Sequence, residues 1–188
     1  FVPATEDFTT NGQIERFTAA SRMLHDFKFF LDQRDIKSVY WAQYDDPEVF
    51  GDGVDRCGLI SLDGRRKASF NAFKIYADMP PERKSVESFC PDIEGMASSD
   101  EHRACLAVWS MADDDKVIDI HFSGTDFNAC NLKVYRIDSE HASFVDNPCS
   151  EELEAVEQHL FNNSGNITWS GLIPAKGVIY FVIEKCPD

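Results

Sequence analysis

The chain has 188 residues, of which 43% are hydrophobic and 12% aromatic, so it can bury a core and does not have the composition of a disordered segment. A formal net charge of -15, without clustered Lys and Arg, argues against a surface for nucleic-acid phosphates. No apolar run is long enough to span a bilayer. A complete (β/α)8 barrel needs about 250 residues, so this chain is too short to hold such a barrel together with another domain.

The first part of the chain alternates strand and helix patterns. A short apolar stretch, residues 1–4, precedes polar residues, and apolar side chains then recur at helical spacing over residues 14–31. A second apolar stretch covers residues 36–41, and a second helical pattern covers residues 67–76. Between them, Asp63-Gly64 is a hairpin signal. Strands that alternate with helices predict parallel β/α structure.

After Pro80-Pro81 the pattern changes to short apolar runs separated by turn residues. The runs cover residues 104–109, 117–122, 132–137, 167–169 and 178–183. This spacing predicts an antiparallel β-sandwich, and Asp113-Asp114-Asp115 predicts a hairpin tip between the first two runs. One helix is expected over residues 151–160, where Ser150 can serve as the N-cap.

Six cysteines and two glycosylation sequons favour an oxidising compartment. The cysteines show no CxxC pair and no zinc-like spacing, and they are Cys57, Cys90, Cys105, Cys130, Cys149 and Cys186. The sequons make Asn162 and Asn166 candidate glycosylation sites. Together they predict a secreted protein, or one in the lumen of the secretory pathway, with disulfides. Cys130 with Cys149 is the preferred pair; free thiols and unused sequons are the alternative.

Two strand ends carry residues from which a site could be built. Glu6 follows the first apolar stretch, and Trp41, Gln43, Tyr44 and Asp45 end the second. Catalytic groups of (β/α)8 enzymes lie at such ends, and Glu6 could be the nucleophile of a retaining glycosidase or an ordinary solvated acid. Trp41 could stack on a sugar ring or pack in the core. Asp45, like the acid after it, could bind sugar hydroxyls or cap a turn.

Several short motifs resemble the last two βα units of clan A glycoside hydrolases. Thr5-Glu6 is similar to the motif that carries the nucleophile on the seventh strand, and Trp41 to the Trp that ends the eighth. The segment that leads into the last helix is matched at Gly58, Leu59, Asp63, Gly64, Lys67 and Ala68. Residues 132–144, LKVYRIDSEHASF, resemble the Y-R-I-D-x-x-H-S-N segment of family 39, the β-xylosidase and α-L-iduronidase family.

This resemblance implies an α/β plus all-β fold. Residues 1–80 would be the C-terminal portion of a (β/α)8 TIM barrel, and residues 81–188 a β-sandwich accessory domain. The implied function is that of a C-terminal fragment of a secreted retaining glycoside hydrolase that binds a carbohydrate, with Glu6 as nucleophile and the acid/base outside this chain. Two βα units cannot close a barrel, so strands one to six would come from the N-terminal remainder of the same precursor, either after proteolytic processing or because this chain is part of a longer polypeptide.

The chain also departs from the family pattern. Asp7 and Phe8 stand where an aromatic and Gly often follow the nucleophile, and Ala142-Ser143 replaces Ser-Asn. Two other functions therefore stay open: a catalytically inactive extracellular structural or adhesive module, and a carbohydrate-binding β-sandwich. The histidines have no mutual ligand spacing and Asp113-Asp114-Asp115 lacks the pattern of a calcium loop, so no metal or cofactor is expected.

Overall fold

The computed structural model describes residues 15–41, 44–46, 58–124, 127, 129–162 and 166–186. The chain divides into two compact units. The first, called the helical unit here, joins Phe1–Lys74 with Ile137–Leu153, and the second, the sheet unit, joins Ile75–Arg136 with Glu154–Asp188. Residues 137–153 therefore fold with the N-terminal part, although in sequence they lie between two strands of the sheet unit.

Two helices match the two helical patterns of the sequence. They are α2 (Thr18–Asp32) and α3 (Ala68–Asp78), whose last turn belongs to the sheet unit. The buried apolar side chains of α2 lie at helical spacing: Ala19, Ala20, Met23 and Leu24. Phe27 of α2 meets Phe73 of α3 edge to face, with ring centroids 4.8 Å apart. Both predicted helices are confirmed.

The segment at residues 36–41 was expected to be a strand and is not one. Every residue from 31 to 40 is exposed, and Tyr40 is 86% exposed. An inner strand of a parallel barrel needs a neighbour on each side to bond its backbone, and the described residues of the helical unit supply none here. A single parallel bridge, between Asp45 and Ile60, follows the segment. The strand expected at residues 1–4 lies outside the described residues.

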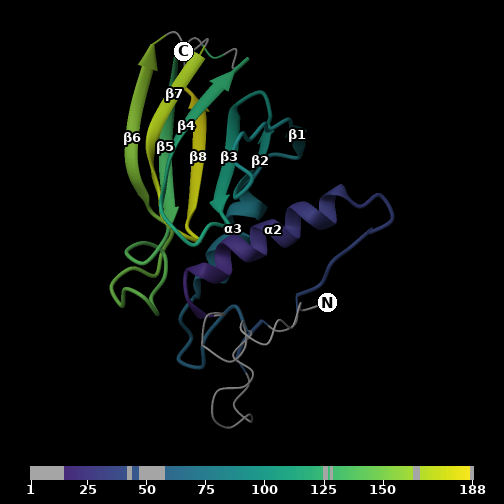
Figure 1. Ribbon diagram of the computed structural model, residues 1–188, viewed down its shortest axis with the longest axis vertical. Helices are drawn as coiled ribbons and strands as arrows, with labels where there is room; N and C mark the ends of the chain where they lie inside the picture. The colour runs from purple at the N-terminus through teal and green to yellow at the C-terminus, as the bar shows by residue number, and fades with distance from the viewer. Residues whose placement is uncertain are drawn as a thin grey trace. The chain divides into compact units, whose positions relative to one another are not determined.

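The described residues of the sheet unit form two antiparallel sheets (Figure 1). One has the strand order β1-β2-β3-β8-β5-β6, and the other pairs β4 with β7. The strands are β1 (Glu82–Lys84), β2 (Ile93–Ser99), β3 (Arg103–Ser110), β4 (Lys116–Ser123), β5 (Ala129–Ile137), β6 (Ala155–Asn162), β7 (Asn166–Ile173) and β8 (Val178–Lys185). The five strands expected from apolar runs are thus present as β3, β4, β5, β7 and β8.

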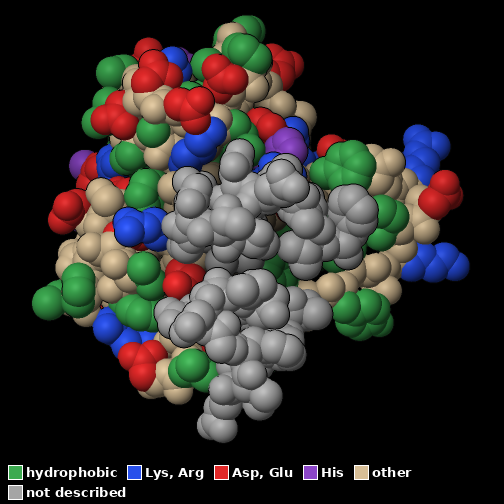
Figure 2. All heavy atoms as spheres, turned by 60° about the horizontal axis from the view of Figure 1, so that its bottom comes forward, with side chains coloured by type: hydrophobic (Ala, Val, Ile, Leu, Met, Phe, Trp, Pro, Cys, Tyr) green, Lys and Arg blue, Asp and Glu red, His purple; other side chains and the backbone are tan. Residues whose placement is uncertain are grey.

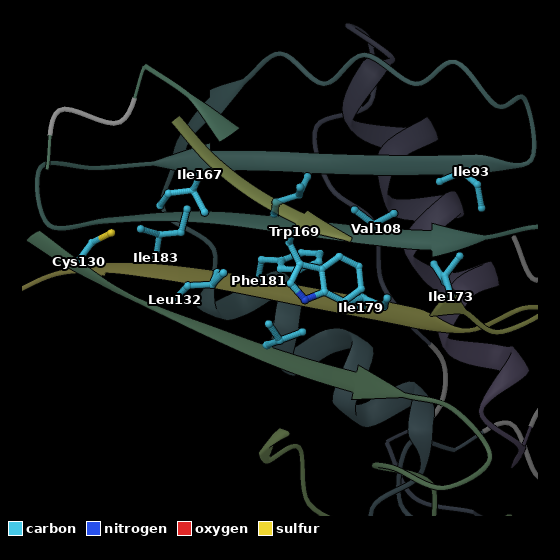
Figure 3. Close-up of a cluster of buried hydrophobic side chains, with 12 residues drawn as sticks. Ile93, Val108, Cys130, Leu132, Ile167, Trp169, Ile173, Ile179, Phe181 and Ile183 are labelled. Atoms are coloured by element: carbon cyan, nitrogen blue, oxygen red, sulfur yellow. The ribbon is translucent and has the colours of Figure 1, made fainter. Parts of the chain in front are cut away.

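An apolar core lies between the two sheets of this unit (Figure 3). Phe181 of β8 meets Trp169 of β7 edge to face at 5.0 Å between ring centroids, and Phe122 of β4 at 5.6 Å. Alternate residues of β3, β4, β5 and β8 supply much of this core, as in two sheets packed face to face. A Cβ on Gly171 would lie only 2.3 Å from the Trp169 ring, so a glycine leaves the space that this indole fills.

Two local predictions for the sheet unit are wrong. The helix expected over residues 151–160 is replaced by strand β6, which pairs antiparallel with β5. Its side chains follow period two, with Phe161 against the core and Leu160 exposed. Asp113-Asp114-Asp115 is not a hairpin tip, because β3 and β4 lie in different sheets. The residues connect the two sheets instead.

No disulfide joins any two of the described cysteines. Cys90, Cys105, Cys149 and Cys186 carry free thiols. The expected pair of Cys130 with Cys149 is not formed, because Cys130 is buried in the core between the sheets whereas Cys149 is exposed in the segment that folds with the helical unit. Cys57 lies outside the described residues.

Candidate functional site

Some of the residues predicted to form a site lie within the described part of the chain. Trp41, Tyr44 and Asp45 are described, whereas Glu6 and Gln43 lie outside the described residues. The role of Glu6 as nucleophile therefore stays a prediction. The three described residues stand at the C-terminal end of segment 36–41, where the chain meets the hairpin of residues 58–66.

Backbone hydrogen bonds join residues 44–46, which follow segment 36–41, to the hairpin. The N–H groups of Leu59 and Ile60 donate to the carbonyl oxygen of Tyr44 at 2.8 and 3.0 Å. The N–H of Asp46 donates in turn to the carbonyl oxygen of Ile60 at 2.9 Å. The backbone around Tyr44 is thus held on a fixed support, which is the condition for precise placement of a binding side chain.

A buried ion pair strengthens the same support. The Lys67 side chain is 0% exposed, and its Nζ lies 2.7 Å from Oδ2 and 2.8 Å from Oδ1 of Asp46. Glu15 adds a carboxylate oxygen 3.5 Å from the same Nζ. Buried charges persist only when they are paired and hydrogen-bonded. Asp46 is therefore the buried partner of Lys67 and is not open to a sugar.

Glycines shape the hairpin that carries this support. The N–H of Gly58 donates to Oδ1 of Asp46 at 2.9 Å, and a Cβ on Gly58 would lie 2.5 Å from backbone atoms of Asp45 and Asp46. Gly64 has φ +81° in the turn, and Ser61 N–H donates to the Arg65 carbonyl at 2.9 Å across it. The hairpin predicted from Asp63-Gly64 is confirmed, and the need for glycine at position 58 comes from close approach.

The aromatic side chains at the strand end differ in exposure. The Trp41 ring is half-buried and meets Phe73 of α3 edge to face at 6.0 Å between centroids. This contact gives Trp41 a packing role. Tyr44 is 64% exposed, and the side chain of Asp45 next to it is exposed as well. Tyr44 and Asp45 are therefore the predicted site residues that offer a ring face and a carboxylate to solvent.

Residues 138–144, the second half of the segment that resembles family 39, form a tight turn within the helical unit. Oδ1 of Asp138 accepts the N–H groups of Glu140 and His141, each at 2.9 Å, and lies 2.8 Å from Nδ1 of His141. Ala142 follows with φ 53°, a left-handed conformation that is unfavourable for a side chain with a Cβ. Ser150 compensates through its Oγ, which accepts the Ala142 N–H at 2.9 Å.

Glu151, seven residues after this segment ends, is bound by the hairpin and by α3. Nε of Arg65 donates to Oε2 of Glu151 at 3.1 Å, and the N–H of Arg66 donates to Oε1 at 2.9 Å. The hydrogen bond from the Arg66 backbone is the main cause that lowers the pKa of Glu151; Arg65 adds to it, against the opposing effect of burial. Asn71 of α3 donates to the carbonyl oxygens of Ala142 and Glu151, both at 2.9 Å.

Sequence reasoning missed the buried polar groups that organise this region. Asp46 was expected to cap a turn or to bind sugar hydroxyls, and Glu151 to begin a helix. The only sequence signal for Lys67 was its place in the glycoside hydrolase motif, because lysine is among the residues least often buried. Its partners Asp46 and Glu15 are far away in sequence, and no local pattern connects them.

The described residues hold no metal cluster and no long apolar helix. No group of three or more His, Cys, Asp or Glu side chains among them could hold a metal ion. None of the helices in this part of the chain has the length and apolar character needed to cross a membrane. Figure 2 shows Lys and Arg side chains scattered among Asp and Glu on the face in view.

Comparisons with known proteins give a match in structure. No protein-family model matches the chain, and no curated protein matches it in sequence. A monomeric β-xylosidase from Caulobacter crescentus has a TM-score of 0.77 and 13% identity over 95% of this chain and 43% of its own. A GH39 enzyme from Xanthomonas axonopodis pv. citri has a TM-score of 0.72 and 12% identity over 95% of this chain and 42% of its own.

The chain is similar in fold to the C-terminal part of family 39 glycoside hydrolases. A GH30 endoxylanase from Clostridium papyrosolvens has a lower TM-score, 0.62, and 12% identity over 90% of this chain and 39% of its own. Family 39 and family 30 both belong to clan A, so the resemblance seen in short motifs is confirmed for the fold. The chain spans about two fifths of the length of these enzymes.

Proposed function

We propose that this chain is the C-terminal part of a secreted retaining glycoside hydrolase of the family 39 type. The observation that carries the proposal is the similarity in fold, over 95% of this chain, to the C-terminal part of a β-xylosidase. In this proposal the helical unit is the end of a (β/α)8 barrel, and the sheet unit is the accessory β-sandwich. Glu6 is the nucleophile, and the acid/base lies on polypeptide outside this chain.

The exposed segment at residues 31–40 supports an incomplete barrel. Ile36, Val39 and Tyr40 are apolar or aromatic and exposed, whereas an inner strand of a parallel barrel buries such side chains. Burial of one Ile or Val side chain contributes about 1.5–3 kcal/mol. The proposed partner is the N-terminal remainder of the same precursor. It supplies barrel strands one to six and pairs with residues 36–41.

The residues that follow segment 36–41 supply substrate-facing groups of the proposed site. Glu6 attacks the anomeric carbon, the acid/base protonates the leaving oxygen, and water then releases the sugar from Glu6. Tyr44 offers its ring face to a sugar and Asp45 accepts hydrogen bonds from sugar hydroxyls. Trp41 packs against Phe73 of α3 and so has a supporting role in this site.

The alternative of a carbohydrate-binding sandwich gains no support from the exposed face of the smaller sheet. Its outward-facing pairs on β4 and β7 are Val117 with Leu172, Asp119 with Ser170, His121 with Thr168, and Ser123 with Asn166. These strands present no Phe, Tyr or Trp on that face, and sugar stacking needs an aromatic platform. The described residues of this face therefore do not favour a carbohydrate-binding sandwich over a hydrolase.

A covalent trap tests the proposal. The precursor that holds this chain with the preceding barrel strands is incubated with 2-fluoro glycosides of several sugars and then mapped by peptide mass spectrometry. We expect label on Glu6, and loss of label and of turnover in Glu6→Gln. Asp7→Asn, at the neighbouring acid, is the matched control and keeps the label. A competent enzyme labelled at another carboxylate would refute the role of Glu6, and a folded precursor without turnover would favour the inactive module.

A further inference from the structure

We propose that the chain carries N-linked glycans on both Asn162 and Asn166 and that the two glycans project from opposite faces of the sheet unit. The sequons Asn162-Asn163-Ser164 and Asn166-Ile167-Thr168 lie almost side by side in the sequence. Both acceptor residues are exposed, as glycosylation requires. This inference goes beyond the proposed hydrolase and holds whether or not the chain takes part in catalysis.

Asn166 lies on the outer face of the β4–β7 sheet. Its neighbour Ile167 is buried in the core between the sheets, and side chains alternate along a strand. Asn166 and Thr168 therefore share the opposite, exposed face, where their partners across β4 are Ser123 and His121. The buried middle residue holds the strand in place, while the acceptor and the Thr that completes the sequon both face solvent.

Asn162 lies on the outer face of the six-stranded sheet. Phe161 before it packs against the core, so Asn162 points to the other side together with Leu160. The pairing with β5 leads to the same assignment of faces, because paired residues share a face of the sheet. Phe161 pairs with the buried Cys130, and Leu160 pairs with Asn131. Two acceptors four positions apart thus belong to different sheets and face away from each other.

The glycan on Asn162 would protect an exposed edge. Strand β6 is the last strand of the six-stranded sheet, and it contains no Lys or Pro. Leu160 is 73% exposed on it. Unprotected edge strands with apolar side chains pair with other chains. A sugar chain on Asn162, two residues from Leu160 on one face, covers this side chain and hinders such pairing.

Site mapping tests the occupancy of the two sequons. The full chain, preceded by a secretion signal, is made in a eukaryotic host and treated with peptide N-glycosidase, which converts each glycosylated Asn to Asp. We expect conversion at both positions, loss of one glycan in Asn166→Gln and Thr168→Ala, and retention in Thr168→Ser, which keeps the sequon. Translation with endoplasmic reticulum microsomes repeats the assay where secretion is poor. Absence of both glycans, with a control glycoprotein modified in the same reaction, would overturn the proposal.

Self-association tests the role of the glycan on Asn162. We expect Asn162→Gln to raise the fraction of chain that sediments as aggregate, and Asn166→Gln to leave it unchanged. Adding Leu160→Lys to Asn162→Gln should restore the original fraction, because a charge on the edge replaces the glycan. Equal aggregation of the two single variants, or no rescue by Leu160→Lys, would remove the protective role.

Discussion

The sheet unit and the helical unit bury their apolar side chains to different degrees. The sheet unit closes a core between two sheets, with Trp169 and Phe181 in contact at its centre. The helical unit buries one face of α2 and leaves residues 31–40 exposed, including Tyr40. A sheet that packs on another sheet completes itself, whereas a barrel strand needs neighbours on both sides. The sheet unit thus depends mainly on an apolar core, whereas the helical unit combines its apolar contacts with buried polar ones, such as Lys67 with Asp46.

The largest expected effect tests those polar contacts in the helical unit. Asp46→Ala leaves the buried Lys67 charge without its main carboxylate, which typically costs about 3–5 kcal/mol. We expect faster hydrogen exchange across residues 58–74 and a lower free energy of unfolding. Lys74→Met is the control, because its contact with Glu152 is long and half exposed, and exposed pairs contribute about 1 kcal/mol or less. Equal loss in the two variants would contradict a structural role for the buried pair.

A second substitution tests the apolar core of the sheet unit. Gly171→Ala places a methyl group against the Trp169 ring and forces it from its site. Overpacking of this kind costs about 1–3 kcal/mol. Urea unfolding, followed by tryptophan fluorescence, measures the loss, and Ser170→Ala on the exposed face is the matched control. An unchanged midpoint for Gly171→Ala would show that the indole has room to move.

A smaller effect is expected where the sheet unit also uses a polar contact. Tyr180 donates its hydroxyl to Asp78 at 2.8 Å, beside the Arg103 guanidinium, and burial raises the pKa of Tyr180 far above its usual value, with Cys105 and Asp78 adding to the shift. Tyr180→Phe removes the hydroxyl contacts with Asp78 and with the Cys105 thiol but leaves Asp78 paired with Arg103, so we expect a loss of about 1 kcal/mol. Tyr135→Phe, whose ring lies 5.8 Å from that of Tyr180 between centroids, is the control. A loss as large as that of Asp46→Ala would remove the contrast between the units.

The smallest expected effect is a pH dependence confined to the helical unit. The pKa of Glu151 is lowered in the folded chain, so its contribution to stability is present above the ordinary Glu value near 4.5 and is lost as pH falls through the lowered one. We expect the hydrogen-exchange protection factors in residues 137–153, which are corrected for the intrinsic pH dependence of exchange, to fall below about pH 4.5. Glu151→Gln should flatten this dependence, and an unchanged slope in that variant would assign it to another acid.

Local sequence patterns predicted much of the secondary structure. They failed where pairing with a strand that is distant in sequence determines whether a segment forms a strand. The helices α2 and α3 and the hairpin at Asp63-Gly64 follow from spacing and turn chemistry within a few residues. Strand β6 was expected to be a helix, because AVEQHLFN has no β-branched run to mark it and only its pairing with β5 fixes period two. Segment 36–41 has a strand sequence, but no neighbouring strand is present among the described residues.

The sequence by itself determined the family likeness, the division into two kinds of structure and the positions of most strands, because motifs, turn residues and periodicity are local. Only the tertiary structure decided that Lys67 is buried on Asp46, that residues 137–153 fold with the helical unit, and that Asn162 and Asn166 face opposite ways. Each of these three features depends on which segment, distant in sequence, packs against the residues concerned. Burial and charge pairing are properties of that neighbourhood, and a linear pattern does not encode them.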